Sequence, residues 1–498
     1  MSAIGTETTL GQEYSTAVPH YRIEDAAERS ELDASTRFPV LLYLGSGLFW
    51  LLVGTVFALI ASFKLHNPQL FDGGTLSWLA WPRVRTAHLN AVIYGWASTA
   101  GIGVGIWLIA RLCRTPLRYP AIVIVAGIFW NIGVAIGITA ILAGQSTGVE
   151  WLEFPPYVAA ILFFSYILIS IWTVLMFYYR EPGHIYVSQW YLLAAFIWFP
   201  WLYATTYLLI FAYPVQGVLQ AITNWWYGHN VLGLWFTPIG LASAYYFIPK
   251  VIGRPVYSYY LSALGFWTLA FFYAWNGGHH LIGGPIPLWI QTVSIVASVM
   301  MIIPVSVVAI NHHLTMTGNF HYLITSPTLR FTVFGAMSYT LVSLQGMSMA
   351  IPSLNYITHF THYTIGHSHL GLYSFYTSII FGAMYYIVPR LTECEWPSAN
   401  LIKLHFWCVF YGSALMFVCL SIGGITQGTM WLTKSGELPA FQFIDTVQST
   451  IPYLIGRSVA GTILAIGHVV FAYHFGLMIL RMGQRTGQPT LFIEPAKA

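Results

Sequence analysis

Six histidines at the edges of apolar segments are the residues of this chain that could do metal chemistry. Neutral imidazole is the commonest metal ligand among side chains, and it binds both copper and iron. A lone histidine inside a membrane is as often a hydrogen-bonding group between helices as a functional residue, but six at one depth favour a metal site. The six are His88, His229, His279, His280, His367 and His369.

The spacing of these histidines divides them into two kinds of site. His367 and His369 are two residues apart, which places them about 200° apart around a helix, so we expect them to bind different metal ions. His279 and His280 are adjacent and flanked by glycines, where the backbone can turn both imidazoles toward one ion. With His229 they make a three-imidazole site suited to copper or zinc.

One histidine of the six remains after this division. His88 is left to complete a bis-histidine haem with either His367 or His369. The sequence pattern by itself does not choose between these two partners.

The elements that must position the histidines are membrane helices. Of the 498 residues, 57% are hydrophobic and only 7% are charged, whereas soluble domains have about 25% charged residues. Apolar runs of about 20 residues span a bilayer as helices. We therefore predict an all-α polytopic membrane protein with twelve transmembrane helices. The expected spans are 41–63, 87–111, 120–143, 155–178, 187–212, 220–248, 256–280, 287–310, 330–351, 367–388, 402–425 and 456–480.

The distribution of cations predicts the orientation of these spans. Of the 20 Lys and Arg residues, fifteen fall in the tails and even-numbered loops, and both chain ends are therefore expected in the cytoplasm. The net charge of +4 reflects this asymmetry and gives no argument for nucleic acid binding. We predict a cytoplasmic tail over 1–37, a twelve-helix domain over 38–481 and a second cytoplasmic tail over 482–498, without internal repeats.

This orientation brings all six histidines near the outer face. The spans follow from hydropathy and the orientation follows from the Lys and Arg residues, so the common depth of the histidines is independent support for grouping them. The other membrane or loop histidines are expected to have structural roles. His312, His313 and His321 are assigned to an inner loop, and His405, His468 and His474 to the last two spans.

Three motifs show what family the pattern belongs to. They are Trp225-Trp226-Tyr227-Gly228-His229-Asn230, Tyr273 with Gly278-His279-His280, and Gly366-His367-Ser368-His369. With them the chain resembles the catalytic subunit I of the haem-copper oxidases over essentially all twelve spans, as a divergent member of the C family, the cbb3-type cytochrome c oxidases. The ligands that this resemblance implies are His88 and His369 for a low-spin haem b, His367 for a high-spin haem b, and His229, His279 and His280 for copper.

The position of a tyrosine marks the subfamily. In other oxidase families it follows the first copper histidine by four residues, where this chain has Gly233. Tyr273 instead occupies the C-family position, and the resemblance implies a covalent bond between Tyr273 and His229. The implied reaction is reduction of dioxygen to water, with Tyr273 as the catalytic residue beside the metals.

A proton route is expected to use hydroxyl groups, because all 16 acidic residues are predicted to lie in tails or loops. Hydroxyl groups in spans often bond only to the backbone, so each member is a weaker prediction than the set. The residues that match the single proton channel of the cbb3 type are Thr237, Tyr245, Ser262 and Tyr339.

The chain departs from the family pattern at two positions. Gln345 stands where the family usually has a glutamate, and Gly265 replaces a histidine common in span seven. Since an amide does not exchange a proton in the physiological range, proton pumping is not implied for this chain.

Five cations lie on the outer side, and Arg85 is expected to pair with a haem propionate because a carboxylate at the membrane edge needs a cation. Arg83 and Arg457 are further candidates for this pairing. Plain anchoring at the membrane interface is the alternative role.

The partners implied by the resemblance are membrane-anchored cytochrome c subunits and a cytochrome c or similar donor, because this chain has no Cys-x-x-Cys-His for covalent haem. The expected location is the cytoplasmic membrane of a prokaryote. The runner-up function is a nitric oxide reductase of the same superfamily, which would need a glutamate beside a non-haem iron. A non-enzymatic haem carrier or gas sensor would need no copper triad, and a secondary transporter would need neither haem nor copper ligands.

Overall fold

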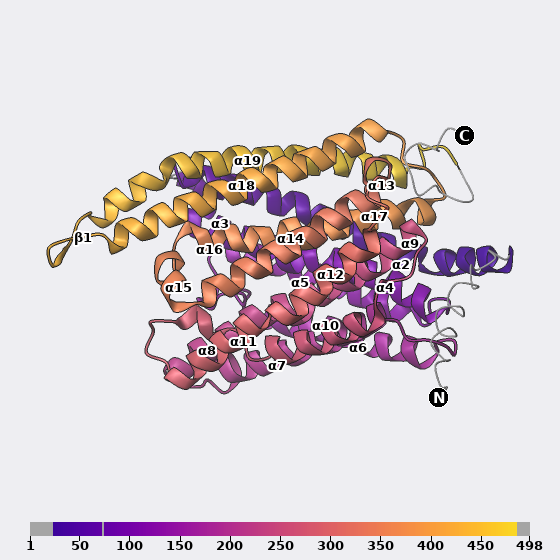
Figure 1. Ribbon diagram of the computed structural model, residues 1–498. Helices are drawn as coiled ribbons and strands as arrows, with labels where there is room; N and C mark the ends of the chain where they lie inside the picture. The colour runs from indigo at the N-terminus through magenta and orange to yellow at the C-terminus, as the bar shows by residue number, and fades with distance from the viewer. Residues whose placement is uncertain (1–22, 72–73, 486–498) are drawn as a thin grey trace, which may run out of the picture.

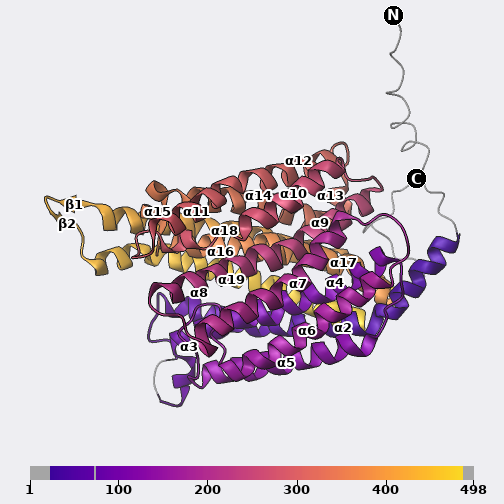
Figure 2. The same cartoon turned by 90° about the horizontal axis from the view of Figure 1, so that it is seen from below.

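The protein is a bundle of long helices whose axes run nearly parallel, and the computed structural model describes residues 23–71 and 74–485 (Figures 1 and 2). The elements of the first half are α2 (Ile23–Lys64), η1 (Gly74–Leu79), α3 (Trp81–Asn90), η2 (Ala91–Ala97), α4 (Ser98–Cys113), α5 (Pro120–Leu142), α6 (Pro156–Tyr178), α7 (Val187–Tyr207), η3 (Leu208–Ala212), α8 (Val218–Asn230), η4 (Val231–Phe236) and α9 (Thr237–Ile252). Those of the second half are α10 (Tyr259–Tyr273), η5 (Gly278–Leu281), α11 (Leu288–Met300), α12 (Ile302–Met316), α13 (Tyr322–Thr325), α14 (Pro327–Ala350), α15 (Pro352–Thr358), α16 (His362–His369), η6 (Leu370–Thr377), α17 (Ser378–Thr392), α18 (Ala399–Leu432), β1 (Lys434–Ser435), β2 (Leu438–Pro439) and α19 (Phe443–Ile479).

The all-α membrane fold is as expected, but the count of twelve spans is not confirmed in full. Within the described ranges, 10 helices are long and apolar enough to cross a membrane. The other two expected spans are also helical, yet α10 has only 15 residues, and α14 is longer but more polar. The polarity of α14 comes from the serine, threonine, tyrosine and glutamine side chains that it carries into the bundle interior.

Three segments form the centre of the bundle, and each carries one or two of the six histidines. In the 18-residue apolar windows of Trp81–Cys113, Val218–Ile252 and His362–Thr392, 94%, 89% and 83% of the residues are buried, whereas the share is at most 50% in the other candidate spans. In each central segment a π-helical stretch begins within three residues of a histidine. π-helical turns are frequent at functional sites, so their recurrence beside the histidines fits a functional role for these segments.

The seventh expected span ends earlier than predicted. Helix α10 stops at Tyr273, and the short 3-10 turn η5 then carries His279 and His280. Gly277 between them has a φ of +114°, and a side chain there would collide with the backbone carbonyl of Trp225. Since only glycine tolerates both conditions, Gly277 is what turns the chain back toward α8.

Two elements project beyond the common length of the bundle (Figure 1). Helix α2 begins at Ile23, so the part of the expected N-terminal tail after that residue continues the first span as helix. At the other end α18 and α19 extend as a hairpin that carries β1 and β2 at its tip (Figures 1 and 2). Residues 1–22 and 486–498 of the predicted tails lie outside the described residues.

The long helix α2 brings an acidic residue into the bundle, contrary to the expectation that acids stay outside the spans. Asp33 is buried and accepts hydrogen bonds from Trp107 Nε1 at 2.9 Å and from Arg111 Nε at 3.0 Å. The sequence prediction failed here because it treated everything before residue 38 as tail. The ion pair fastens the N-terminal part of α2 to α4.

Candidate metal and haem sites

The three histidines of the expected copper site lie together. One ring nitrogen from each of His229, His279 and His280 falls within 4.8 Å of the others. The ring centroids are 4.6 Å apart for His229 and His279, and 5.4 Å apart for His229 and His280. Three imidazoles from α8 and η5 can therefore bind a single ion, as copper or zinc would require.

Neighbouring side chains fix the orientation of two of these rings. Ser298 Oγ lies 2.9 Å from His279 Nδ1 and donates a hydrogen bond to Asn276 Oδ1 at 3.0 Å. The ring of His280 stacks on Trp225 with centroids 4.2 Å apart and planes 12° apart. Because Nδ1 of His279 is engaged, its Nε2 is the nitrogen left for a metal, which is how second-layer partners orient metal-bound histidines.

The third ring presents an unsatisfied nitrogen to this site. His229 Nδ1 is buried and has no hydrogen-bond partner among the described residues. Leaving a buried polar atom unpaired costs about 1–3 kcal/mol, so a bound metal ion would satisfy it. The donor chemistry of the cluster therefore fits the copper that the sequence pattern implies.

Tyr273 packs directly against the metal cluster. Its ring centroid is 5.2 Å from that of His229. The ring occupies the space beside Gly233, where a Cβ atom would overlap the Tyr273 ring. Gly233 on η4, which has no side chain, therefore makes room for the tyrosine that α10 supplies.

The other three histidines each have Nδ1 held by a hydrogen-bond partner. His88 Nδ1 lies 2.9 Å from the carbonyl oxygen of Gly54 on α2. His369 Nδ1 lies 2.8 Å from the carbonyl oxygen of Ile365 one turn earlier on α16. Both rings are thereby turned so that Nε2 is free for an axial bond to iron.

The structure separates His367 from His369 as their spacing predicts. His367 interacts electrostatically with His229 and with the rest of the copper cluster. His369 instead interacts with His88. Of the two alternatives that helix geometry left open, this arrangement favours His369 as the histidine that faces His88.

Gln345 touches the histidine that faces the copper cluster. Its Oε1 lies 3.3 Å from His367 Nδ1, where it can accept a hydrogen bond. Its Nε2 is buried without a partner in the described part of the chain. The residue that departs from the family pattern therefore still contacts a candidate ligand, although an amide cannot exchange a proton there.

The outer arginines differ in their partners. Arg85 pairs with Glu150 at 2.9 Å, and Arg83 donates to the carbonyl oxygen of Leu142. Arg457 interacts electrostatically with His88 and His369 but has no acidic partner among the residues described. An unpaired cation beside two haem-ligand candidates fits a propionate, so Arg457 suits that role better than Arg85 does.

The four hydroxyl residues of the expected proton path lie on the helices around Tyr273. Ser262 Oγ accepts from Asn311 Nδ2 at 2.9 Å. Tyr339 lies within electrostatic range of both Tyr245 and Tyr273, and Thr237 interacts with the Tyr273 side chain. The structure therefore brings the set together in one region, although direct hydrogen bonds do not link all its members.

Sequence reasoning missed one histidine in this region. His312 is not in a loop but on α12, where its ring lies 4.5 Å from that of Tyr245 with its Nε2 buried and unpaired. His313 also lies on α12. The sequence allowed the correct assignment, because the helix predicted to end at residue 310 can continue by one more turn. The length needed to span a membrane does not determine at which residue the helix ends.

A buried acid near the outer face was also missed. Glu153 precedes α6 in the loop after α5, and burial raises the pKa of its carboxyl group to about 7. Asn90 Nδ2 donates to Glu153 Oε2 at 3.2 Å, while Oε1 has no partner in the described chain. A loop position hid this burial from the sequence analysis.

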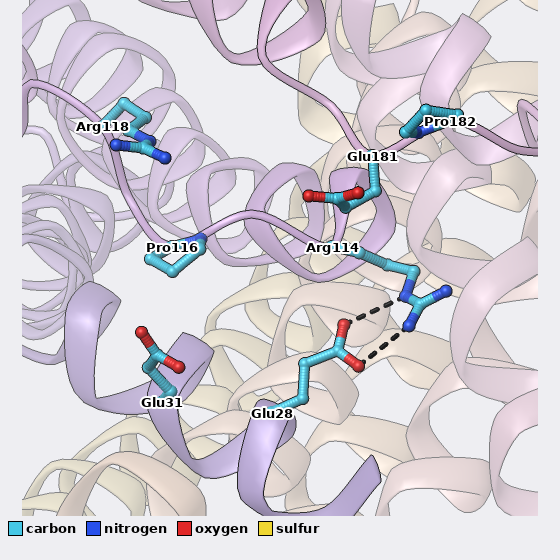
Figure 3. Close-up of a pocket in the computed structure, with 7 residues that line it drawn as sticks. All are labelled: Glu28, Glu31, Arg114, Pro116, Arg118, Glu181 and Pro182. Carbon is cyan, nitrogen blue, oxygen red and sulfur yellow. Dashed lines mark hydrogen bonds and ion pairs between the residues drawn. The ribbon is translucent and has the colours of Figure 1, made fainter. Parts of the chain in front are cut away.

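A hollow with a volume of about 460 Å³ opens far from the histidines, beside the projecting part of α2. Figure 3 shows its lining, where the carboxylate of Glu28 forms two hydrogen bonds with the guanidinium of Arg114. The hollow is exposed and lined by charged side chains and prolines. It has no connection to the metal chemistry of the central segments.

Known proteins share this fold and much of this sequence. Residues 38–463 match the family model described as cytochrome c and quinol oxidase polypeptide I. The cytochrome c oxidase subunit 1 homolog of Bradyrhizobium diazoefficiens bacteroids is 32% identical over 90% of this chain and 83% of its own length. The Cbb3-type cytochrome c oxidase subunit of Stutzerimonas stutzeri is 31% identical over 85% of this chain and 91% of its own length.

A solved structure extends the likeness to the fold. A heme-copper terminal oxidase dimer studied by cryo-electron microscopy has a chain with a TM-score of 0.70 to this one. It is 16% identical, and the match covers 95% of this chain and 87% of that chain. At this identity the comparison supports the helical architecture alone.

Proposed function

We propose, from the premise that this chain belongs to the cytochrome c and quinol oxidase polypeptide I family, that it is the catalytic subunit of a cbb3-type cytochrome c oxidase. It reduces dioxygen to water with electrons from cytochrome c and takes up protons in the process. The observation that carries this proposal is the packing of Tyr273 against His229 beside Gly233.

The residues of the outer half fit the cofactors of such an enzyme. His229, His279 and His280 would hold copper, His367 a high-spin haem b, and His88 with His369 a low-spin haem b. When bound, the metals supply electrons and the binding place for dioxygen. Arg457 or Arg85 would neutralise haem propionates.

Tyr273 has a separate part in this chemistry. Breaking the bond in dioxygen without releasing reduced fragments needs four electrons in quick succession, and a phenol can give one together with its proton. Its position against His229 also suits the covalent bond that the family forms, which releases two protons and two electrons that dioxygen, the proposed substrate, would accept. Thr237 interacts with the Tyr273 side chain and is placed to return the proton.

Protons would reach Tyr273 from the inner face through hydroxyl groups. Tyr245, Ser262 and Tyr339 are buried on the way, and Ser262 is hydrogen-bonded to Asn311. Hydroxyl groups can pass a proton only when they exchange partners, so incomplete hydrogen bonding is compatible with this role. The path ends at Thr237 beside Tyr273.

The chain would act in the cytoplasmic membrane of a prokaryote, with both ends in the cytoplasm. Its electrons would arrive through membrane-anchored cytochrome c subunits, because the sequence offers no site for covalent haem. Soluble cytochrome c or a similar protein would supply those subunits.

Nitric oxide reduction is the second candidate, and the composition of the metal cluster disfavours it. In the described chain, the residues grouped to hold a metal are the three histidines, with no carboxylate among them. A non-haem iron site with a catalytic glutamate would need such a group. The tyrosine against His229 points the same way.

The test is to compare consumption of oxygen and nitric oxide by the purified complex with reduced cytochrome c as donor. The proposal expects oxygen turnover to dominate and mass spectrometry to find the peptides of His229 and Tyr273 joined. Faster turnover of nitric oxide than of oxygen, with separate peptides, would support the second candidate. A Tyr273→Phe variant with full oxygen turnover would contradict the assigned role of the tyrosine.

A further inference from the structure

Tyr191 on α7 carries a buried hydroxyl group for which the packing alone gives no reason. The residue is fully buried, and its hydroxyl has no hydrogen-bond partner among the described residues. Its ring stacks against Tyr245 with centroids 6.1 Å apart and planes 15° apart, and it meets Phe266 edge-on at 5.1 Å. These ring contacts would be made equally well by phenylalanine.

The unpaired hydroxyl has an energetic cost that phenylalanine would avoid. A buried hydroxyl without a partner costs about 1–3 kcal/mol. The hydroxyl groups of Tyr245 and Tyr339 are also buried, but they have polar neighbours, Asn311 and Ser262 for Tyr245 and Ser343 for Tyr339. Both lie within electrostatic range of Tyr191, so three buried hydroxyl groups occupy one region, and that of Tyr191 has no partner among the described residues.

A glycine on α10 leaves space for this group. A Cβ atom built at Gly265 would lie 3.8 Å from the Tyr191 hydroxyl oxygen, and 3.2 Å from Val308 on α12. The hydroxyl of Tyr191 therefore reaches the place toward which a side chain at position 265 would point. Helix α7, which packs against both α9 and α10, thus supplies a polar group that α10 lacks.

Polar groups in such an arrangement can be joined by buried water. A buried water needs two to four polar partners, and the hydroxyl groups of Tyr191, Tyr245 and Tyr339 provide that number. Each hydroxyl can both donate and accept, so a proton can pass along the chain when each group changes its donor and acceptor roles.

We propose that Tyr191 is a proton-relay residue of this enzyme, which connects Tyr245 to Tyr339 beside Gly265. The proposal rests on the proposed function, since it extends the path that supplies protons to Tyr273. It adds a fifth helix, α7, to a path otherwise built from α9, α10 and α14 with support from α12.

The first test is a Tyr191→Phe variant of the whole complex, compared with a Tyr203→Phe variant on the same helix. We expect Tyr191→Phe to lower oxygen turnover and the rate of proton uptake by about tenfold or more, since losing a proton-transfer group typically costs at least that much. Electron transfer from the donor to the haems and their optical spectra should not change. Tyr203→Phe should keep the rate of the unmodified enzyme.

The second test asks whether a hydroxyl can be restored from the neighbouring helix. In the Tyr191→Phe background, Gly265→Ser should recover a measurable part of the lost proton uptake, whereas Gly265→Ala should not. A structural role of Tyr191 would make the two double variants equal. This comparison remains informative if Tyr191→Phe binds less haem, because rates are expressed per haem.

The results distinguish the relay from the proposed function. If the unmodified enzyme consumes oxygen and Tyr191→Phe keeps at least half of its turnover and proton uptake, the relay is wrong and the oxidase function stands. Equal rates for the serine and alanine double variants would also contradict the relay. If the unmodified enzyme has no oxygen turnover, the proposed function fails and the relay fails with it.

Discussion

The histidine region near one end of the bundle and the hydroxyl region deeper in it differ in how firmly their polar atoms are held. Around the proposed metals, His88, His279 and His369 each have Nδ1 within hydrogen-bonding distance of a fixed partner, and His229 Nδ1 is the exception. In the hydroxyl region, Tyr191 has no partner among the described residues, and Tyr245 and Tyr339 have only other small polar groups near them, Ser262, Asn311 and Ser343. Both regions lie in the same well-packed bundle, so looser packing does not explain the difference.

The difference follows from what each region has to do. A metal ligand must hold one orientation, and a hydrogen bond to its second nitrogen provides it. A proton relay must instead change partners at each transfer, so a permanent hydrogen bond would hinder it. The comparison therefore predicts strong, specific effects from changes in the histidine region and graded effects in the hydroxyl region.

The largest effect is expected from removing a ligand. His279→Ala should abolish copper binding and lower oxygen turnover by more than about a thousandfold, because losing a catalytic metal removes several kcal/mol of stabilisation. Metal analysis and oxygen consumption measure this. His313→Ala, an exposed histidine on α12, is the control, and equal turnover of the two variants would contradict the site.

A change that moves Tyr273 without touching a ligand should have the next largest effect. Gly233→Ala places a methyl group where the Tyr273 ring lies, so the tyrosine must move away from His229. We expect turnover to fall by about a hundredfold, as misplacement by about 1 Å can cause, while both haems still bind. Gly476→Ala, which meets no atom within 4 Å, should be neutral. Normal turnover of Gly233→Ala would show that Tyr273 need not pack there.

The hydroxyl region should respond more weakly to a single change. Tyr339→Phe removes one hydroxyl from the path, and we expect about tenfold slower proton uptake, less than the roughly hundredfold or more that a general acid or base contributes. The matched control is Tyr411→Phe, since Tyr411 is 58% exposed on the outer surface of α18. A loss of copper in Tyr339→Phe would mean that the two regions are not separate.

The smallest effect is expected on stability, through the buried carboxyl group of Glu153. Burial raises the pKa of Glu153 to about 7, so between pH 4.5 and 7 the folded protein holds a proton that the unfolded chain has released. This contribution to stability is therefore largest at low pH and is lost as the pH rises, by at most about 1.4 kcal/mol per pH unit.

Thermal unfolding followed across this pH range measures the effect. Glu153→Gln should remove the part of the pH dependence of stability that Glu153 causes. As the pH rises, the Tm of the unmodified protein should therefore fall relative to the Tm of the variant. Parallel curves would show that Glu153 titrates at its ordinary pKa. Asp445→Asn at the start of α19, an exposed acid, is the control.

The histidine region could be predicted from the sequence more fully than the hydroxyl region. Hydropathy placed His88, His229 and His367 at one depth, and helix geometry separated His367 from His369. Ligand types and periods are local features, and both can be read along one segment. The bend at Gly277 was not predicted, because the periodicity of apolar residues does not show where an α-helix ends and a 3-10 turn begins.

Tyr191 shows what the sequence cannot give. Its neighbours Tyr245 and Gly265 lie on two other helices, and nothing in the sequence around residue 191 specifies which helix it faces. The same holds for Asp33, whose partner Arg111 is known only once α2 is seen to extend inward. Contacts between helices far apart in sequence require the packed structure.

The metal content of the purified complex tests the central claim most directly. The account predicts one copper together with one low-spin and one high-spin haem b for each copy of this chain, measured by metal analysis and by optical spectra with carbon monoxide. Loss of the copper alone in His279→Ala would locate it at the histidine triad. Iron in place of copper at the triad, or spectra without a high-spin haem, would contradict the account.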